Sequence, residues 1–318
     1  MLKQLASVVV LMLTGLWLGG CSTVQVYQSP VFDFQTAVTA ANDSIRPYLL
    51  GVNDRAAKAN LYDKVAMGKP WGTEDLHAGI PLEEIHVRLQ ALSTIASYAN
   101  LLGAVANTKS GEQLAQAAEA LCDNVNDLNS TMQELAERRK AAFSRGVSAR
   151  QAATLDLSGP LSSLLTLFGT LAFEGKQKAA IEAAIINGDK PVRQLIALLK
   201  ADLRSLTLVD DGSYAAMQIG MLKLYNDARN KTDPKDLIAL IDEFVQKDNQ
   251  IRTMRALRVD SLLSDMENAQ AAVVTFAKSG KGPKDLSNLA EQIAVFTAHV
   301  KLFSDAVSSV ESTVRTSK

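Results

Sequence analysis

Few residues in this chain of 318 could carry out chemistry. The sequence has three histidines, His77, His86 and His299. Glu83 and His86 form a Glu-x-x-His pair, which places two potential metal ligands on one face of a helix. A di-iron bundle needs two such pairs and a glutamate from each of two further helices, and the sequence has no second pair. We therefore predict neither a metal site nor a cofactor.

The sequence also contains none of the common catalytic motifs. It has no Gly-x-Ser-x-Gly elbow, no His-Glu-x-x-His, no Cys-x-x-Cys and no dinucleotide-binding fingerprint. Its 33 basic and 34 acidic residues nearly balance, whereas a nucleic-acid-binding protein normally has a basic excess. We predict a protein that is not an enzyme and does not bind nucleic acid.

The first 21 residues have the composition of an export signal. Lys3 gives a short positive region, residues 5–18 are apolar and uncharged, and small residues precede Cys21. Leu18-Gly19-Gly20-Cys21 resembles the lipobox of bacterial lipoproteins. The resemblance implies that peptide 1–20 is removed and that Cys21 receives several acyl chains, which anchor a protein stably in a membrane. An ordinary signal peptide or a short membrane anchor is the alternative.

Ser22 bears on where such a lipoprotein would be sorted. An aspartate at this position retains lipoproteins at the inner membrane, so the resemblance implies the outer membrane, with the protein facing the periplasm. Residues 21–31 are predicted to be a lipidated tether, of which the part from Ser22 to Pro30 reaches at most about 30 Å. The folded body should therefore lie close to the membrane.

Past the tether, apolar residues recur at steps of three and four, which is typical of amphipathic helices that pack along a seam. The last segment shows this best, with Leu286, Leu289, Ile293, Phe296, Val300, Phe303, Val307, Val310 and Val314. Similar seams occupy residues 34–52, 85–96, 114–135 and 237–276. We predict an all-α fold: residues 32–318 form a single domain, an elongated antiparallel bundle of long, coiled-coil-like helices.

Helix ends are predicted from capping residues, glycine and proline. Asp233-Pro234 should start a helix, and Gly280-Lys281-Gly282-Pro283 should separate two helices. Asn187-Gly188-Asp189-Lys190-Pro191 should stop one helix and start the next, and Asp210-Asp211-Gly212-Ser213 should break or kink another. Residues 234–279 contain no breaker and are predicted to form one helix about 70 Å long.

Residues 157–173 form an apolar segment without a charge. A bilayer span needs about 20 apolar residues, and serine and threonine dilute this segment, so we favour a helix buried in the bundle. The alternative is a concealed membrane-inserting segment, as in helical pore-forming toxins. The inserting residues would then be Leu164, Leu165, Leu167, Phe168, Leu171 and Phe173.

Two other features could bind a protein partner. Trp71 lies in the long loop 68–81, where an exposed aromatic side chain would be a good anchor for a partner, although closing the end of the bundle is the favoured role. A basic cluster near a helix end could also contact a partner or a membrane surface, although the favoured interpretation is that its charges suit the helix dipole. The cluster contains Arg138, Arg139, Lys140, Arg145 and Arg150.

These features favour a periplasmic lipoprotein, anchored in the outer membrane, that acts as a helical scaffold, spacer or adaptor for an envelope protein. A protein that inserts residues 157–173 into a membrane, and a bundle that sequesters a ligand in an apolar inner groove, are the alternatives. Lipidation of Cys21 would leave Cys122 as the remaining thiol. We expect Cys122 to be buried, with an intermolecular disulfide as the alternative.

Overall fold

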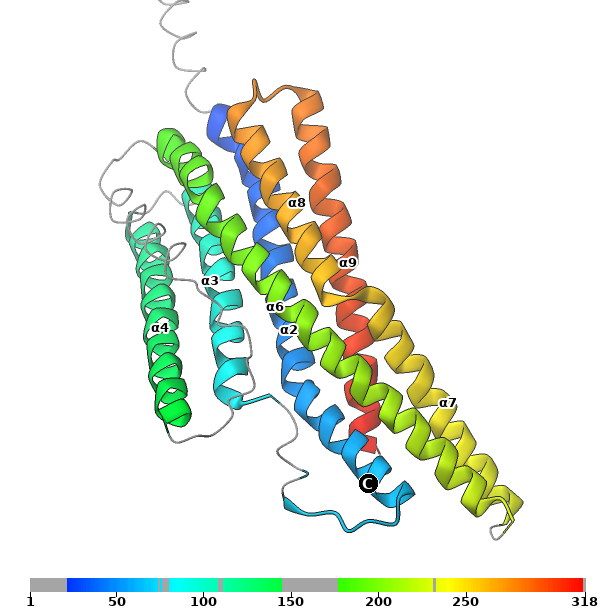
Figure 1. Cartoon of the computed structure of the whole chain (residues 1–318). Helices are drawn as coiled ribbons and strands as arrows, with labels where there is room; N and C mark the ends of the chain where they lie inside the picture. Colours follow the sequence, from blue (N-terminus) through cyan, green and yellow to red (C-terminus); the bar gives the residue numbers. More distant parts are fainter. Residues whose placement is uncertain are drawn as a thin grey trace, which may run out of the picture.

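The structure is a computed structural model, and it describes residues 22–73, 75, 80–107, 111–144, 177–230 and 233–316. The regular structure of this part is helical, which confirms the predicted all-α bundle (Figure 1). Its helices are α2 (Ser22–Ala66), α3 (Leu82–Asn107), α4 (Gly111–Ser144), α6 (Gln177–Ala228), α7 (Pro234–Leu257), α8 (Val259–Lys278) and α9 (Pro283–Thr316).

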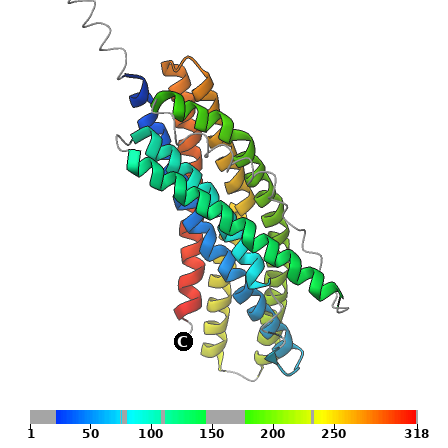
Figure 2. The same cartoon turned by 90° about the vertical axis from the view of Figure 1, so that its left-hand side faces the viewer.

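Helices α2 and α6 lie side by side and run in the same direction (Figure 1). Tyr27 near the start of α2 donates a hydrogen bond to Glu182 near the start of α6, and Tyr62 near the end of α2 lies against Gly220. Helix α3 packs on both α2 and α6 and carries α4 on its outer side (Figure 2). Helices α2, α4, α6 and α9 run one way, and α3 and the pair α7–α8 run the other way (Figure 1).

The core contains mostly aliphatic side chains and alanine, which allow the helices to approach closely. Two aromatic pairs are packed edge to face: Tyr27 with Phe276 at 5.4 Å and Tyr48 with Phe303 at 5.8 Å between ring centroids. Most of the predicted seam of α9 is buried, which agrees with the predicted packing. Its buried members are Leu289, Ile293, Phe296, Val300, Phe303, Val307 and Val310.

The start of α2 differs from the extended tether that the sequence suggested. The helix begins at Ser22, so residues 22–31 are helical, and Tyr27 and Val31 are buried. The physical reason is that the seam of α2 begins before Phe34: Tyr27 and Val31 continue its steps of three and four toward the N-terminus. The body therefore begins directly after Cys21.

Residues 234–279 form two helices, so the prediction of one uninterrupted helix is wrong. The break lies at Arg258, whose φ of 32° is left-handed. The Arg258 guanidinium donates two hydrogen bonds to the Asp260 carboxylate, at 3.0 and 2.9 Å. These bonds raise the pKa of Arg258 and lower that of Asp260. The break comes from side-chain contacts rather than from a glycine or proline, which is why the sequence pattern did not predict it.

Helix α6 runs through residues 187–191, where a stop was predicted, and through residues 210–213, where a break or kink was predicted. Pro191 removes one backbone hydrogen bond, but apolar burial on both sides of it stabilises the helix. Gly188 has a packing role, because a Cβ atom there would lie 2.6 Å from Cε2 of Tyr98. The buried residues around Pro191 are Ile181, Ala184, Ile185, Val192, Leu195 and Ile196.

A buried ion pair joins α3 to α6. Nε and Nη2 of Arg88 donate hydrogen bonds to the two carboxylate oxygens of Asp202, at 2.5 and 3.0 Å. Nη1 of Arg88 also lies 3.6 Å from Glu84, one turn earlier on α3. All three side chains are buried, and a buried charge is costly unless it is paired. The pair therefore fixes how α3 is aligned along α6.

Candidate functional site

The two ends of the bundle carry the features that could serve a function. We call the end where α2 begins, beside the α8–α9 turn, the anchor end, and the end where α2 finishes the distal end (Figure 1). Helix α2 has 45 residues and connects the two ends, over about 68 Å at 1.5 Å per residue.

At the anchor end, three elements fix the first turns of α2. The hydroxyl of Tyr27 donates to Oε1 of Glu182 at 3.1 Å, and Nζ of Lys281, in the α8–α9 turn, lies 3.0 Å from the same oxygen. Lys281 also lies 5.7 Å from the centroid of the Tyr27 ring, which packs on Phe276. Burial and the negative charge of Glu182 raise the pKa of Tyr27, so this phenol remains a hydrogen-bond donor. The N-terminal part of α2 is therefore held against α6, α8 and the turn.

At the distal end, hydrogen bonds to α2 hold the loop that follows it. Asn53 donates to the Ile80 carbonyl at 2.8 Å and accepts from its N–H at 2.6 Å. The Asp75 carboxylate accepts from the Gly72 N–H at 2.9 Å and lies 3.2 Å from Nζ of Lys64. The Gly72 hydrogen bond, with a smaller contribution from Lys64, lowers the pKa of Asp75. Asp75 and Ile80 are thus tied to α2, while residues 67–71, which directly follow the helix, are exposed.

This loop brings the exposed side chain of Trp71 to the distal end, next to the last turns of α2. The side chain of Trp71 is 41% exposed and belongs to neither buried cluster. Its favoured role, closing the end of the bundle, stays a prediction. Three apolar side chains at the end of α2 are exposed as well. We call the four residues together the distal surface: Leu61, Val65, Met67 and Trp71.

The basic cluster predicted near the end of α4 is described only in part. Arg138 is exposed, and its Nη1 lies 3.2 Å from Oε1 of Glu83 at the start of α3. Arg139 and Lys140 belong to α4, but the structure does not describe their side chains, and Arg145 and Arg150 lie outside the described residues. The described contact is thus an exposed ion pair between α4 and α3, of the kind that contributes little to stability.

Several other predicted sites also fall outside the described residues. Cys21 and the proposed inserting segment 157–173 are among them, and for Ser22 the structure describes the backbone only. Two described helices, α3 and residues 283–310 of α9, are long and apolar enough to cross a membrane. In the bundle, 72% of the apolar stretch of α3 and 39% of that of α9 is buried, and burial of this kind is also typical of core helices.

The side chains of Glu83 and His86 are exposed on α3. Within the described ranges, no group of three histidine, cysteine, aspartate or glutamate side chains is placed to hold a metal ion. Cys122 is half-buried on α4, and burial, with a smaller effect of Asp123, raises the pKa of its thiol. A raised pKa reduces the thiolate fraction and therefore makes this cysteine less nucleophilic.

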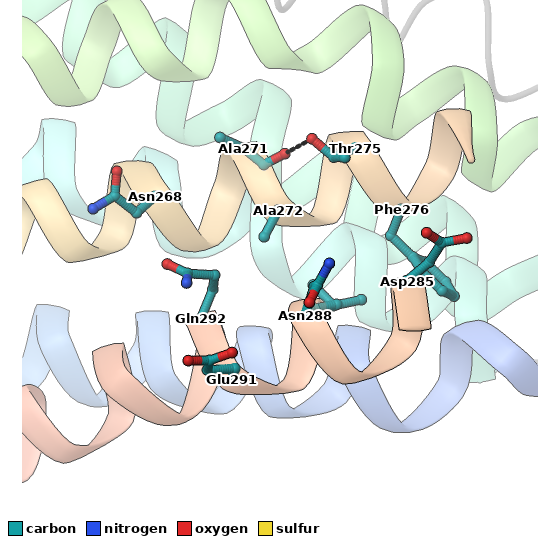
Figure 3. A pocket seen from close by; sticks show the side chains of 10 residues that line it. Asn268, Ala271, Ala272, Thr275, Phe276, Asp285, Asn288, Glu291 and Gln292 are labelled. Carbon is teal, nitrogen blue, oxygen red and sulfur yellow. Dashed lines mark hydrogen bonds between the residues drawn. The ribbon is translucent and has the colours of Figure 1, made fainter. Parts of the chain in front are cut away.

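A groove of about 390 Å³ lies between α8 and α9, near the turn that joins them (Figure 3). Amide and carboxylate side chains line it over a floor that includes Ala272, with Asn268 on α8 and Asn288, Glu291 and Gln292 on α9. Thr275 donates its hydroxyl to the Ala271 carbonyl at 2.8 Å. This open groove has a mixed polar and apolar lining, which includes Phe276 and Leu289, and it differs from the enclosed apolar inner cavity that a ligand-sequestering bundle would need.

A second exposed apolar surface, on α6 and α7, was not predicted from the sequence. Five large aliphatic side chains are exposed there: Ile219 and Leu222 on α6, and Ile238, Ile241 and Val245 on α7. None of the α7 side chains that the structure describes is buried. Ile241 lies within the predicted seam of residues 237–276, yet its side chain is 37% exposed. One sequence feature could have predicted this surface: both helices carry apolar residues on two faces, whereas a helix with a single seam carries them on one.

Comparison of the chain with protein-family models, with curated proteins and with solved structures gives no match. A proposal about function therefore rests on the residues and contacts of this chain.

Proposed function

We propose that this chain is a lipid-anchored, non-enzymatic spacer of the bacterial outer membrane, which presents its distal surface to a protein of the cell envelope. The observation that carries the proposal is the continuity of α2. This one helix begins at Ser22, next to the cysteine of the lipobox-like sequence, and ends at Ala66, next to the loop that holds Trp71.

The contacts at the anchor end support a spacer role. Tyr27 lies six residues after Cys21, a rise of about 9 Å along a helix. It is fixed by Glu182, Lys281 and Phe276, on three different parts of the bundle. A lipid on Cys21 would thus be attached to a helix that is itself part of the core. The distal surface would be held at a set distance from the membrane, instead of moving freely on a flexible tether.

The distal surface supports a role in binding a protein. Trp71 and Met67 follow α2, and Leu61 and Val65 lie one turn apart at its end. Exposed apolar side chains occur at many protein–protein contacts, and tryptophan is enriched among the residues that dominate binding energy. The partner that fits is a protein with an apolar pocket in its contact surface.

The anchoring half of the proposal is tested by labelling cells with a clickable palmitate analogue and separating their membranes. We expect label in the wild-type chain and none in Cys21→Ser, which should move to the soluble periplasmic fraction. Ser22→Asp should keep the label and shift the protein to the inner-membrane fraction. A wild-type chain without label, or a Cys21→Ser chain that remains in the outer membrane, would overturn the anchoring.

The binding half is tested by placing a photocrosslinking amino acid at position 71 or 65 in intact cells. The matched control is position 32, because Phe32 is similarly exposed on α2 but lies near the anchor end. We expect the same envelope protein to be crosslinked from positions 71 and 65 and not from position 32. Crosslinks from position 32 alone, or none from 71 and 65, would contradict this role of the distal surface.

A further inference from the structure

The apolar surface on α6 and α7 lies on one side of a helical hairpin, and polar contacts between the two helices define its geometry. Tyr214 and Gln218 of α6 both donate hydrogen bonds to Oδ1 of Asp248 on α7. About two turns away on both helices, Nε of Arg255 lies 2.6 Å from Oδ1 of Asp211. Gln218 and Asp248 therefore point toward each other, and they fix both the facing sides and the relative height of the two helices.

The positions of the apolar side chains follow from this alignment. On α6, Leu222 and Ile219 are turned about 40° and 100° from Gln218, at 100° per residue. On α7, Ile241, Val245 and Ile238 are turned about 20°, 60° and 80° from Asp248 in the same sense. On two antiparallel helices, side chains that are turned in the same sense from the facing direction lie on the same side of the hairpin. We call the surface that these five residues form the hairpin face.

The opposite side of the hairpin is already covered. Met217 and Met221 of α6 are buried there with Tyr214 and Ala59, and Phe244 of α7 packs against them. Tyr62 of α2 belongs to the same cluster. The hairpin thus has two apolar sides, of which the bundle covers one. The other is a surface of closely spaced aliphatic side chains with no covering element among the described residues.

Two charged residues at the edges of the hairpin face indicate what covers it. Lys223 on α6 and Asp242 on α7 are both exposed, and neither makes an ion pair with another described residue. They are turned about 140° and 120° from the direction of the neighbouring helix, so they point outward at opposite edges. Gln218 and Asp248 face each other at the same height. Lys223 lies five residues from Gln218 toward the turn between α6 and α7, and Asp242 lies six residues from Asp248 toward the same turn. Their heights along the hairpin therefore differ by about one residue. Lys223 and Asp242 therefore carry opposite charges at about the same height on opposite edges.

We propose that the hairpin face binds a second copy of this chain through a two-fold axis parallel to α6 and α7. This axis places α6 of one copy over α7 of the other, with the two helices antiparallel. Lys223 then meets Asp242 of the partner subunit at one edge, and the symmetric pair forms at the other edge. The five aliphatic side chains of each copy are buried between the two pairs, and the two hairpins form a four-helix contact.

This symmetry also suits the proposed function, although the dimer does not depend on it. A two-fold axis parallel to the helices leaves both anchor ends on the same side. If Cys21 is lipidated, both lipids can enter the same membrane leaflet. An axis perpendicular to the helices would place the two anchor ends on opposite sides instead.

The test uses charge reversal in the full chain, purified in detergent, with oligomeric mass measured by native mass spectrometry. Lys223→Asp leaves an acidic residue at both positions, and Asp242→Lys leaves a basic residue at both. The dimer dissociation constant of each variant alone should therefore rise by about tenfold or more. An equimolar mixture of the two should form heterodimers, and the double variant Lys223→Asp/Asp242→Lys should recover the homodimer. Lys301→Asp, on the exposed side of α9, is the matched control and should leave the dimer unchanged.

A second pair of variants tests the apolar centre. Leu222→Asp should abolish the dimer, whereas Val295→Asp, at a similarly exposed position of α9, should not. Circular dichroism should show wild-type helix content in both variants, because both positions face solvent. A wild-type chain that is monomeric throughout the micromolar range would overturn the proposal, as would a dimer that neither reversal weakens. Cys21→Ser should still dimerise, so a failure of anchoring and a failure of dimerisation are separate results.

Discussion

His299 of α9 closes the end of α7 by binding the carbonyl of Leu257. Its Nε2 atom lies 2.8 Å from that oxygen, while Nδ1 lies 2.7 Å from Oδ2 of Asp265 on α8. The carbonyl lies next to Arg258, where the helical hydrogen bonds are interrupted, so the imidazole replaces a partner that the backbone has lost. One side chain of α9 thus connects the end of α7 to the second turn of α8.

We expect His299→Ala to destabilise the protein by about 1–3 kcal/mol, because it leaves both the carbonyl and the Asp265 carboxylate without this partner. The free energy of unfolding in urea measures the effect. His299→Gln, which retains a polar amide, should recover part of the loss. Lys301→Ala, at an exposed position two residues along, should change the stability by less than about 0.5 kcal/mol. Equal losses in His299→Ala and Lys301→Ala would contradict this role.

Replacing either Arg88 or Asp202 alone should lower the stability of the protein, and replacing both together should restore part of it. Arg88→Met or Asp202→Leu leaves one charge buried without its partner and should cost about 3–5 kcal/mol. The double variant removes both charges and should recover part of the loss, as measured by a double-mutant cycle in urea; recovery is incomplete because Glu84 loses its contact with Arg88. Additive losses would mean that the two side chains act independently.

Two glycines of α6 make a matched pair for testing the contact with Tyr98. Gly188→Ala places a methyl group 2.6 Å from Cε2 of the Tyr98 ring and should destabilise the protein by about 1–3 kcal/mol. Gly212→Ala meets nothing within 4 Å and should stabilise the same helix by up to about 1 kcal/mol. Thermal unfolding should therefore move in opposite directions for the two variants. A stabilised Gly188→Ala would show that α6 and α3 can separate at no cost.

Cys122 should be alkylated more slowly than a free cysteine at the same pH. Burial raises the pKa of its thiol, so the thiolate fraction at pH 8 is smaller than in an unfolded chain. The rate with iodoacetamide should keep rising at pH values where the rate of a free cysteine has levelled off, and it should reach the free rate in denaturant. A native rate equal to the denatured rate would contradict the burial.

Local pattern was sufficient to predict the helices but not all of their ends. The start of α7 is capped by Asp233, whose carboxylate accepts from the Lys235 N–H at 2.8 Å, and the α8–α9 turn lies at its predicted glycines. The break at Arg258 was missed because no glycine or proline marks it and because His299, which binds the Leu257 carbonyl, lies 42 residues away in the sequence. The stop predicted at Pro191 was overridden by burial on both sides of it.

The distal end could be predicted only in part for a similar reason. Trp71 was selected as a loop aromatic, but its exposure depends on the hydrogen bonds of Asn53 and Asp75, which a sequence pattern does not reveal. The hairpin face was not predicted because the sequence pattern assigns all apolar residues of α7 to the core. Only the structure shows which of them the bundle covers. Phe244 and Ile241 have similar sequence signals, yet only Phe244 packs against the buried cluster.

The direct start of α2 at Ser22 has a mechanical consequence. In the proposed arrangement, a sideways force on Trp71 acts at the far end of a stiff arm whose pivot is the lipid. The resulting torque would reach the acyl chains rather than being absorbed by a loose linker. The protein would then transmit the movement of its partner to the membrane as a tilt, as a lever does.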